Sequence, residues 1–353
     1  MLLKQIGKRL LACVTVSALV VAGSASAAGI AYNIVTSTEN GTYPLIGKDL
    51  ANHIAPAAGI ELQPLFSKGS VENIKRLRDE PGTKLALVQA DVYQAYKDQA
   101  ARGNAEAARL IRPLRVVLPL YDEEVYVITR ADSPLQYISQ IQNLRINIGP
   151  IGSGSAMTAT TLYRAMFKVP MADDKVSTLS NEDALLQLVK DKNLDAVIVV
   201  AGQPTTLFLG MEPGVEKYFK LLKADNSPAL TAALNTYSKS TIRATSYPNW
   251  LKEDHPSVSV KSLLVTFDYN LVHTRQALAG FAKSLCANFD TLQARGHPKW
   301  REVSLRLPPL SAGWSYYGPT SQELGRCVAS AARQTPAASA NCALPDKVMG
   351  LCS

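Results

Sequence analysis

Residues 145–155 read RINIGPIGSGS, and this stretch decides the fold class that the sequence predicts. Arg145–Ile148 has the apolar alternation of a short strand, and residues 149–155 form a turn rich in glycine and serine. The segment that follows repeats apolar residues at the i, i+3, i+4, i+7 spacing of a helix, beginning at Ala159. A strand, a Gly/Ser turn and a helix in this order are the repeating unit of α/β proteins.

The same unit recurs on both sides of this stretch. Ala31–Thr36 predicts a strand before a helix that starts near Pro44, because proline suits the first helical position. Leu85–Val88 and Asp195–Val200 are apolar strands that end in polar residues or a Gly-containing turn. Further strands are expected at Ile60–Phe66, Arg115–Leu120, Val125–Arg130, Val176–Leu179 and Ser262–Phe267. Strands that alternate with helices indicate parallel sheets covered by helices on both faces, so we expect an α/β protein.

The first residues have the pattern of a secretory signal. Met1–Arg9 is basic, Leu10–Val21 is uncharged and mostly apolar, and small residues follow up to Ala27. The apolar run is shorter than the roughly 20 residues that a membrane-spanning helix needs. We therefore expect residues 1–27 to be a signal peptide that is cleaved near Ala27 during export to the periplasm.

Cysteine usage agrees with export. Four cysteines remain after the leader: Cys286, Cys327, Cys342 and Cys352. An even number in an oxidising compartment predicts two disulfides, and all three pairings are open at this point. None of these cysteines has the C-x-x-C spacing of a zinc or redox site.

Length and charge narrow the function further. The chain of 353 residues exceeds one ordinary core, so two lobes are expected. The formal net charge is +8, of which the leader supplies three charges, and basic runs with interleaved aromatic residues are missing from the sequence. Nucleic acid is therefore not indicated as a partner, whereas the mild positive balance fits an anionic ligand.

Three turns between a strand and a helix are the candidate binding elements. Their residues are Asn40, Gly41, Thr42 and Tyr43 in the first, Lys68, Gly69, Ser70 and Val71 in the second, and Ser153, Gly154 and Ser155 in the third. The first N–H groups of a helix lack internal partners and carry partial positive charge, and glycine lets a ligand approach them. Each turn alone also fits a simple helix cap. Three of them in one parallel-sheet pattern favour an anion-binding pocket.

Polar residues at strand ends are the second group of candidates. Gln89 and Asp91 follow the strand at 85–88, and Gln203 follows the strand at 195–200. Ligands of such folds lie beyond the carboxyl ends of the strands, so these side chains are expected to hydrogen-bond the ligand. Solvated loop residues, or a helix cap at Asp91, are the alternatives. The acidic run at 122–124 is interpreted as a solvated turn between two strands.

Catalytic and metal-binding patterns are weak. No G-x-S-x-G surrounds the serines at 149–155, and Met157 stands where a G-x-G-x-x-G pattern needs its third glycine. The four histidines, His53, His255, His273 and His297, have no metal-ligand spacing. We therefore expect a binding protein without metal or cofactor, and an exported enzyme is the least supported alternative.

Taken together, the turns resemble the TAXI family, the solute-binding receptors of TRAP-type transporters. The stretches that carry the resemblance are 38–45 (TENGTYPL), 69–73 (GSVEN), 85–91 (LALVQAD), 149–155 (GPIGSGS) and 199–204 (VVAGQP). They occur in the family's order and extend over residues 31–210. The chain departs from the family pattern at Lys68, where a small residue is usual, and at its first loop, which has less glycine and the single Tyr43.

The resemblance implies a type II periplasmic-binding fold, with two α/β lobes around a ligand cleft. Lobe 1 would comprise residues 28–124 and 240–353, and lobe 2 residues 125–239, with crossovers near Val125–Arg130 and Lys239–Ser246. It implies a small carboxylate-bearing solute, such as glutamate, glutamine or a dicarboxylate, and a TRAP-type membrane permease as partner. A sensor that presents the solute to a receptor kinase fits the same sequence.

Overall fold

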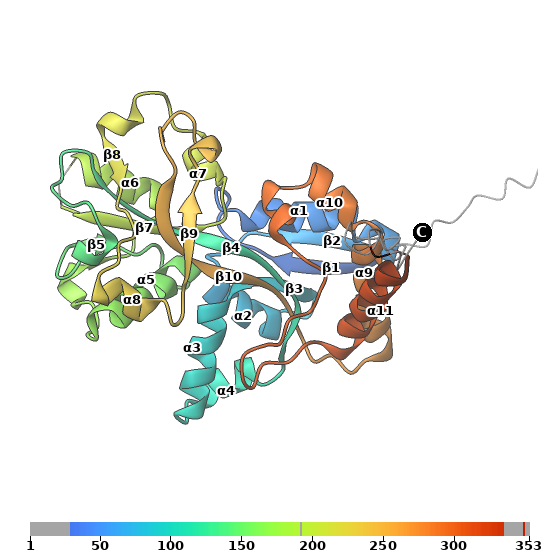
Figure 1. The fold of residues 1–353 in the computed structure, drawn as a ribbon. Helices are drawn as coiled ribbons and strands as arrows, with labels where there is room; N and C mark the ends of the chain where they lie inside the picture. Colours follow the sequence, from blue (N-terminus) through green and yellow to red (C-terminus); the bar gives the residue numbers. More distant parts are fainter. Residues whose placement is uncertain (1–28, 191–192, 335–348, 350–353) are drawn as a thin grey trace, which may run out of the picture.

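The computed structural model describes residues 29–190, 193–334 and 349. The predicted leader and two of the cysteines, Cys342 and Cys352, lie outside these residues. The described chain forms two lobes that share one continuous sheet (Figure 1). Helices α5, α6, α7 and α8 gather in one lobe, whereas α1, α9, α10 and α11 lie at the opposite end of the molecule. The expected α/β class and two-lobe arrangement are confirmed.

The sheet has the strand order β2-β1-β3-β10-β4-β7-β5-β6, with β8 paired to β4 and β9 paired to β10. Its strands are β1 (Ile30–Val35), β2 (Ile60–Leu65), β3 (Thr83–Gln89), β4 (Leu114–Arg130), β5 (Ile146–Asn147), β6 (Val176–Ser177), β7 (Ala196–Ala201), β8 (Phe219–Leu221), β9 (Ser238–Ile242) and β10 (His255–Phe267). Strands β1, β2 and β3 are parallel in one lobe, and β5, β6 and β7 are parallel in the other. Each lobe therefore has the parallel sheet that the alternating pattern predicts.

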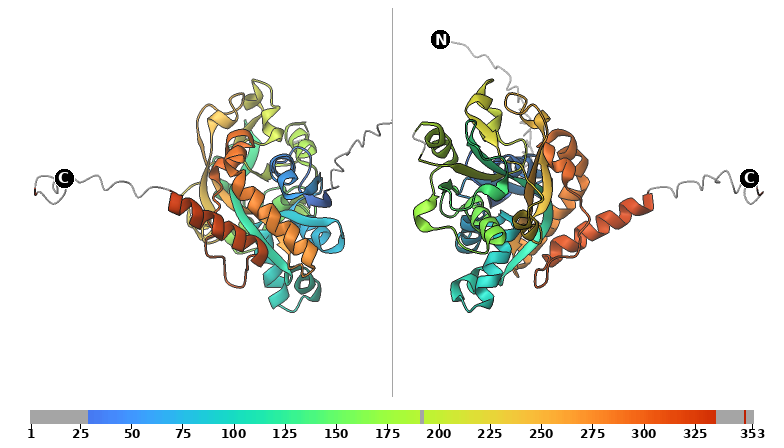
Figure 2. Two further views of the ribbon diagram at one scale, coloured as in Figure 1. Left: turned by 90° about the vertical axis from the view of Figure 1, so that its right-hand side faces the viewer. Right: turned by 60° about the vertical axis from the view of Figure 1, so that its left-hand side comes forward.

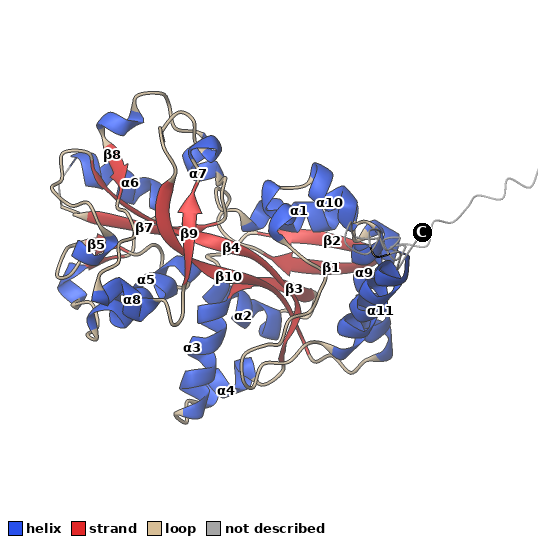
Figure 3. Ribbon diagram, viewed as in Figure 1, coloured by secondary structure: helices blue, strands red, loops and turns tan. Residues whose placement is uncertain are grey.

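Helices cover both faces of this sheet (Figure 3). They are α1 (Tyr43–His53), α2 (Ser70–Asp79), α3 (Ala90–Ala101), α4 (Ala105–Ile111), α5 (Gly154–Phe167), α6 (Asn181–Lys190), α7 (Thr206–Leu209), α8 (Pro228–Ala233), α9 (Val272–Ala287), α10 (Phe289–Arg295) and α11 (Gly318–Gln334). Because a strand turns successive side chains to opposite faces, a strand between two helix layers must be apolar throughout. In β3, Leu85 and Leu87 pack under α1 and α9, whereas Ala86 and Val88 pack with α2 and α3.

The second lobe is built in the same way. In β7, Ile198 and Val200 face a core that contains residues of α5 and α8, whereas Val197 and Val199 face a core that contains residues of α6 and α7. The unbroken apolar run of this strand is thus explained by burial on both faces. The aromatic residues of the second core, which include Tyr126, Tyr247 and Trp250, pack around Phe208 of α7.

Two long antiparallel strands, β4 and β10, join the lobes. Strand β4 pairs with β10 along its first part and with β7 from Glu124 onward. Strand β10 pairs with β9 in the second lobe and with β3 from Ser262 onward in the first. Residues 122–124 lie inside β4, so their interpretation as a solvated turn between two strands is wrong. They stay in the strand because they pair with residues 259–261 of β10 and because Glu123 and Glu124 have buried partners.

Strand β10 at 255–267 is therefore the second connection between the lobes. It begins after the segment near Lys239–Ser246, where the sequence predicted this crossover. Ile242, Tyr247 and Trp250 pack in the core of the second lobe. Nothing in residues 255–267 distinguishes a strand of this length from a shorter buried strand. The sequence therefore did not predict the full length of β10. The exact division of the chain into lobes remains a prediction.

A disulfide joins Cys286 of α9 to Cys327 of α11. Of the three open pairings, the structure thus contains the one that links these two cysteines. Helix α11 lies beside α9 along the outside of the first lobe (Figure 2). Within the described ranges, the helices are too short or too polar to cross a membrane.

Candidate functional site

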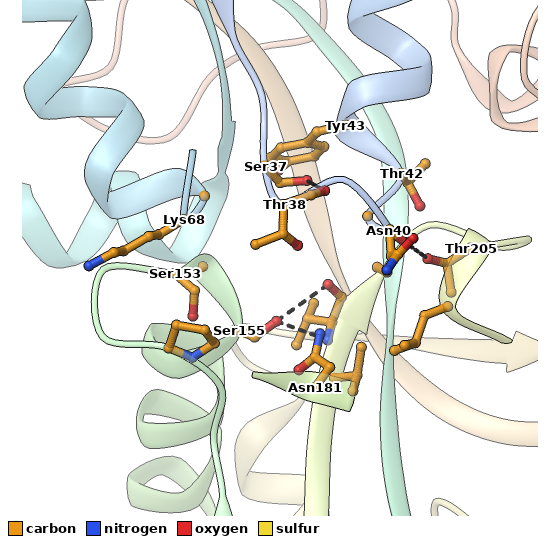
Figure 4. A pocket seen from close by; sticks show the side chains of 18 of the residues that line it. Ser37, Thr38, Asn40, Thr42, Tyr43, Lys68, Ser153, Ser155, Asn181 and Thr205 are labelled. Carbon is orange, nitrogen blue, oxygen red and sulfur yellow. Dashed lines mark hydrogen bonds between the residues drawn. The ribbon is translucent and has the colours of Figure 1, made fainter. Parts of the chain in front are cut away.

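Four helices of the described chain begin around one cavity between the lobes (Figure 4). Helices α1 and α2 come from the first lobe, and α5 and α6 come from the second. The residues at the start of each helix line the cavity, whose volume is about 80 Å³. This volume is several times the roughly 10–15 Å³ that a cavity needs to hold a single water molecule. The cavity therefore has the size of a small solute.

The helix starts turn unpaired N–H groups toward this space. Among the described residues, the amides of Ser70, Gly154 and Ser155 have no hydrogen-bond partner, because the first amides of a helix cannot reach a carbonyl of their own helix. The aligned peptide dipoles add partial positive charge at the same ends. This arrangement attracts an anion without a buried lysine or arginine.

Glycine allows the two lobes to approach closely here. Gly69 precedes α2 with φ 121°, and a Cβ at this position would lie 3.1 Å from the backbone nitrogen of Gly154. A Cβ at Gly154 would lie 2.0 Å from Oε1 of Gln89. Both glycines are therefore needed where a helix start of one lobe meets a helix start of the other.

Side-chain hydrogen bonds hold the cavity wall. The backbone nitrogen of Gln89 donates to Oγ of Ser70 at 3.1 Å, and Oε1 of Gln89 lies 3.3 Å from Oγ1 of Thr158. On the second lobe, the amide of Val200 donates to Oγ of Ser155 at 3.1 Å. These contacts fix polar atoms from β3, α2, α5 and β7 around the same space.

A buried carboxyl group on β4 also lines the cavity. Glu123 is 3% exposed, and the hydroxyl of Tyr43 donates to its Oε2 at 3.0 Å. Burial raises the pKa of Glu123 to about 8; the nearby Glu124 adds to this rise, whereas hydrogen bonds from Gln89 and Tyr43 oppose it. Burial also raises the pKa of Tyr43, so its hydroxyl keeps the proton that it donates. Glu123 is not among the binding residues predicted from the sequence, because an acidic run between two apolar segments is more often a solvated turn.

Hydrogen bonds across the cleft show that the lobes are closed. Oγ1 of Thr42 donates to the carbonyl of Gly202 at 2.6 Å, and Nδ2 of Asn40 donates to Oε1 of Glu182 at 2.8 Å. Oγ1 of Thr205 donates to the carbonyl of Asn40 at 3.0 Å. The first loop therefore contacts the second lobe directly.

Most of the predicted binding residues lie around this cavity. They are Asn40, Gly41, Thr42, Tyr43, Lys68, Gly69, Ser70, Gln89, Ser153, Gly154 and Ser155. Lys68 lies at the exposed edge, and its amine points away from the other labelled side chains in Figure 4. Three other predicted residues, Val71, Asp91 and Gln203, lie elsewhere.

Asp91 connects the lobes away from the cavity. Its Oδ2 accepts hydrogen bonds from Oγ1 of Thr158 at 2.7 Å and from the hydroxyl of Tyr237 at 2.9 Å. Burial raises the pKa of Asp91, and these two hydrogen bonds oppose the rise. The prediction placed Asp91 against the ligand because it follows a strand end, but the helix start at Ala90 turns its side chain toward α5.

Gln203 and Val71 have structural contacts. The side-chain nitrogen of Gln203 donates to Oε1 of Glu124 at 3.0 Å, and its Oε1 accepts from the amide of Arg243 at 2.7 Å. Gln203 therefore links β4 to the segment after β9, and it does not line the cavity as predicted. Val71, the second residue of α2, packs against the apolar core on the outer face of the sheet.

The residues at the start of α6 also line the cavity, and none of them is among the binding residues predicted from the sequence. Ser180, Asn181 and Glu182 line the space. The buried Oδ1 of Asn181 has no hydrogen-bond partner among the described residues. Ser180-x-x-Asp183 is typical of a capped helix, and Oγ of Ser180 accepts a hydrogen bond from the backbone amide of Asp183. This local pattern contains no information about which other helices begin nearby.

In the part of the chain that the structure describes, no group of three or more His, Cys, Asp or Glu side chains is arranged so that it could hold a metal ion. The cavity instead combines helix amides, hydroxyl groups, amide side chains and one buried carboxyl group. These groups can hold a small polar molecule by hydrogen bonds.

Comparison with solved structures identifies proteins that this chain resembles. The substrate-binding protein of an amino acid ABC transporter shares 16% identity over 76% of this chain and 99% of that chain, with a TM-score of 0.46. The periplasmic binding protein BugD shares 13% identity over 86% and 95%, with a TM-score of 0.47. A TctC solute-binding protein from Polaromonas shares 14% identity over 86% and 97%, with a TM-score of 0.39.

Comparison with protein families shows the family of this chain. Residues 34–277 match the NMT1-like family, and this span covers well over half of the chain. It includes the predicted binding turns, the buried carboxyl group of β4 and most of both lobes. The chain belongs to the NMT1-like family.

Proposed function

We propose that this protein is a periplasmic solute-binding protein that closes around a small carboxylate-bearing solute. The observation that carries the proposal is the convergence of four helix starts, two from each lobe, on one small cavity. A carboxylate placed there receives hydrogen bonds from amides that have no other partner among the described residues. Because the amides come from both lobes, the same ligand stabilises the closed form.

The partner that we propose is a TRAP-type permease, as in the TAXI family that the turns resemble. The closed protein would present a surface made of both lobes to this permease. A gene for a multi-span permease beside the gene for this protein supports transport, and a gene for a receptor kinase in that place supports sensing. The chemistry of the cavity gives no reason to propose catalysis.

A thermal-shift screen of the protein lacking residues 1–27 tests the proposal. The compounds are amino acids such as glutamate and glutamine, and dicarboxylates. A ligand at 100 times its dissociation constant stabilises the folded state by about 2.7 kcal/mol. We therefore expect a rise in melting temperature with at least one of them, and the absence of any shift throughout the set contradicts the proposal.

Ser70→Pro should weaken ligand binding roughly 10- to 100-fold. Proline removes the Ser70 N–H at the first position of α2, where the ring itself is tolerated. Loss of a hydrogen bond to a charged group costs about 1.5–3 kcal/mol. Isothermal titration calorimetry with the strongest compound of the screen measures the effect.

Two control variants separate the amide from other effects. Ser70→Ala removes the hydroxyl but keeps the N–H, so it should bind more tightly than Ser70→Pro. Lys252→Ala changes an exposed residue outside the cavity and should leave the affinity unchanged. Equal affinities for Ser70→Pro and Ser70→Ala would exclude the amide as a ligand contact.

A further inference from the structure

The carboxyl group of Glu123 makes no direct ion pair with a residue that the structure describes. The ammonium group of Lys299 contacts Oε1 of Glu124 at 2.6 Å and Oε2 of Glu302 at 2.9 Å. Its charge also lowers the pKa of Glu123, but it makes no direct ion pair with that carboxyl group. Glu123 itself receives hydrogen bonds from neutral groups, namely Tyr43 and Gln89. A buried carboxylate with only neutral donors is costly, so a positive charge from outside the protein would stabilise it.

The other residues that line the cavity do not supply this charge. Among them, the charged side chains besides Glu123 are Lys68 and Glu182, and both are exposed. Glu182 accepts a hydrogen bond from Asn40, and the amine of Lys68 points away from the labelled side chains (Figure 4). The cavity therefore contains two unlike kinds of group, the positive helix starts and the buried acidic side chain of Glu123.

We propose that the cavity is specific for a zwitterionic solute, whose carboxylate binds the helix starts and whose ammonium group pairs with the carboxylate of Glu123. This inference rests on the proposed function and narrows it. It assigns to Glu123 the selection of ammonium-bearing acids over plain acids of the same length. Tyr43 and Gln89 are positioning residues, because they hold the carboxyl group of Glu123.

A second carboxylate on the ligand does not fit beside Glu123 as well. Two carboxylates at hydrogen-bond distance cannot both be ionised, so a dicarboxylate would bind only with a proton held between it and Glu123. An ammonium group has the opposite requirement, because it pairs with the ionised form of Glu123. Because burial raises the pKa of Glu123 to about 8, most empty molecules hold this proton at pH 7. Binding of an ammonium group should therefore release it.

Matched pairs of ligands test the inference by isothermal titration calorimetry. The pairs are L-alanine and propionate, L-aspartate and succinate, and L-glutamate and glutarate, each at pH 7 in phosphate and in Tris. We expect the ammonium-bearing member to bind roughly tenfold more tightly or better in the pair that fits the cavity. The difference in heat between the buffers should correspond to release of a proton on binding, because most of the empty molecules hold one on Glu123.

Glu123→Gln should remove both effects. The amide keeps the shape of the side chain but cannot ionise, so the preference for the ammonium-bearing acid should fall at least tenfold and the proton release should disappear. Glu212→Gln makes the same change at an exposed residue and should bind like the unmodified protein.

The outcomes of these measurements distinguish failure of the Glu123 assignment from failure of the proposed function. If the plain acid binds as tightly as its partner, or if Glu123→Gln keeps the original preference, the assignment of Glu123 is wrong while solute binding stands. Proton release that is present in the unmodified protein and missing in Glu123→Gln supports the ammonium contact with Glu123. If neither member of any pair binds, the proposed function itself fails together with the inference.

Discussion

Lys299→Met should lower the free energy of unfolding by about 3–5 kcal/mol, the cost of leaving one member of a buried ion pair without its partner. Lys299 is 1% exposed and lies in the short helical segment Pro298–Glu302, where its ammonium group bonds Oε1 of Glu124 at 2.6 Å. Methionine keeps the length and the apolar stem of the side chain, so the change removes mainly the charge. Urea unfolding at pH 8, followed by circular dichroism, measures the loss.

The loss should depend on pH. Burial raises the pKa of Glu124, although Lys299 and Gln203 oppose the rise, so removal of Lys299 raises that pKa further. A carboxyl group whose pKa is higher in the folded state takes up a proton on folding as pH falls, and its destabilising effect then disappears. The difference between Lys299→Met and the unmodified protein should therefore shrink from pH 8 to pH 5.

The double variant Lys299→Met with Glu124→Gln serves as the control. It removes both charges, while the oxygen of the new side-chain amide can still accept a hydrogen bond from Gln203, so it should recover most of the lost stability. A double variant that is less stable than Lys299→Met would show that the loss came from packing and not from the unpaired carboxylate.

Gly69→Ala should weaken ligand binding roughly 10- to 100-fold. The backbone of Gly69 has φ 121° and ψ −157°, a region that only glycine adopts readily, and strain of this kind costs about 1–3 kcal/mol. The added Cβ would also lie 3.1 Å from the backbone nitrogen of Gly154 in the opposite lobe. Both effects act against the closed form that holds the ligand. Calorimetry gives the affinity, and small-angle X-ray scattering with saturating ligand shows whether closure still occurs.

Gly325→Ala is the matched control for this substitution. Gly325 lies in α11, and a Cβ there would have no atom within 4 Å. Because alanine is the better helix former, this variant should bind ligand normally and unfold at the same or a slightly higher denaturant concentration. If Gly69→Ala bound the ligand as tightly as Gly325→Ala, the close approach of the starts of α2 and α5 would not be needed for binding.

The sequence was most informative where local chemistry determines the structure. A run such as 195–201 must be a strand buried on both faces, and a turn such as 152–155 must precede a helix, so the α/β class follows from these segments alone. Most of the binding residues that the same rules predicted lie around the cavity, and they make up about half of its lining. Helix starts after parallel strands lie at one edge of a sheet, whatever the details of the loops.

Partners distant in the sequence could not be predicted in this way. Glu124 and Lys299 are separated by 175 positions, and nothing in either segment indicates the other. Without that pairing, an acidic run within 122–124 looks exposed, and β4 looks like two strands. The contact of Asp91 with Tyr237, which spans 146 positions, was hidden for the same reason. In each case, a side chain whose partner is not evident from the sequence makes an ion pair or a hydrogen bond with a distant residue in the fold.

The disulfide between Cys286 and Cys327 has a practical consequence for single-molecule and surface-based measurements. It fastens α11 to α9, on the end of the molecule opposite to α5 and α6 (Figure 1). A fluorophore or a sensor chip coupled through the outer side of α11 will stay anchored there under oxidising conditions without obstructing solute entry. Such a handle would let lobe movements be recorded directly on immobilised protein.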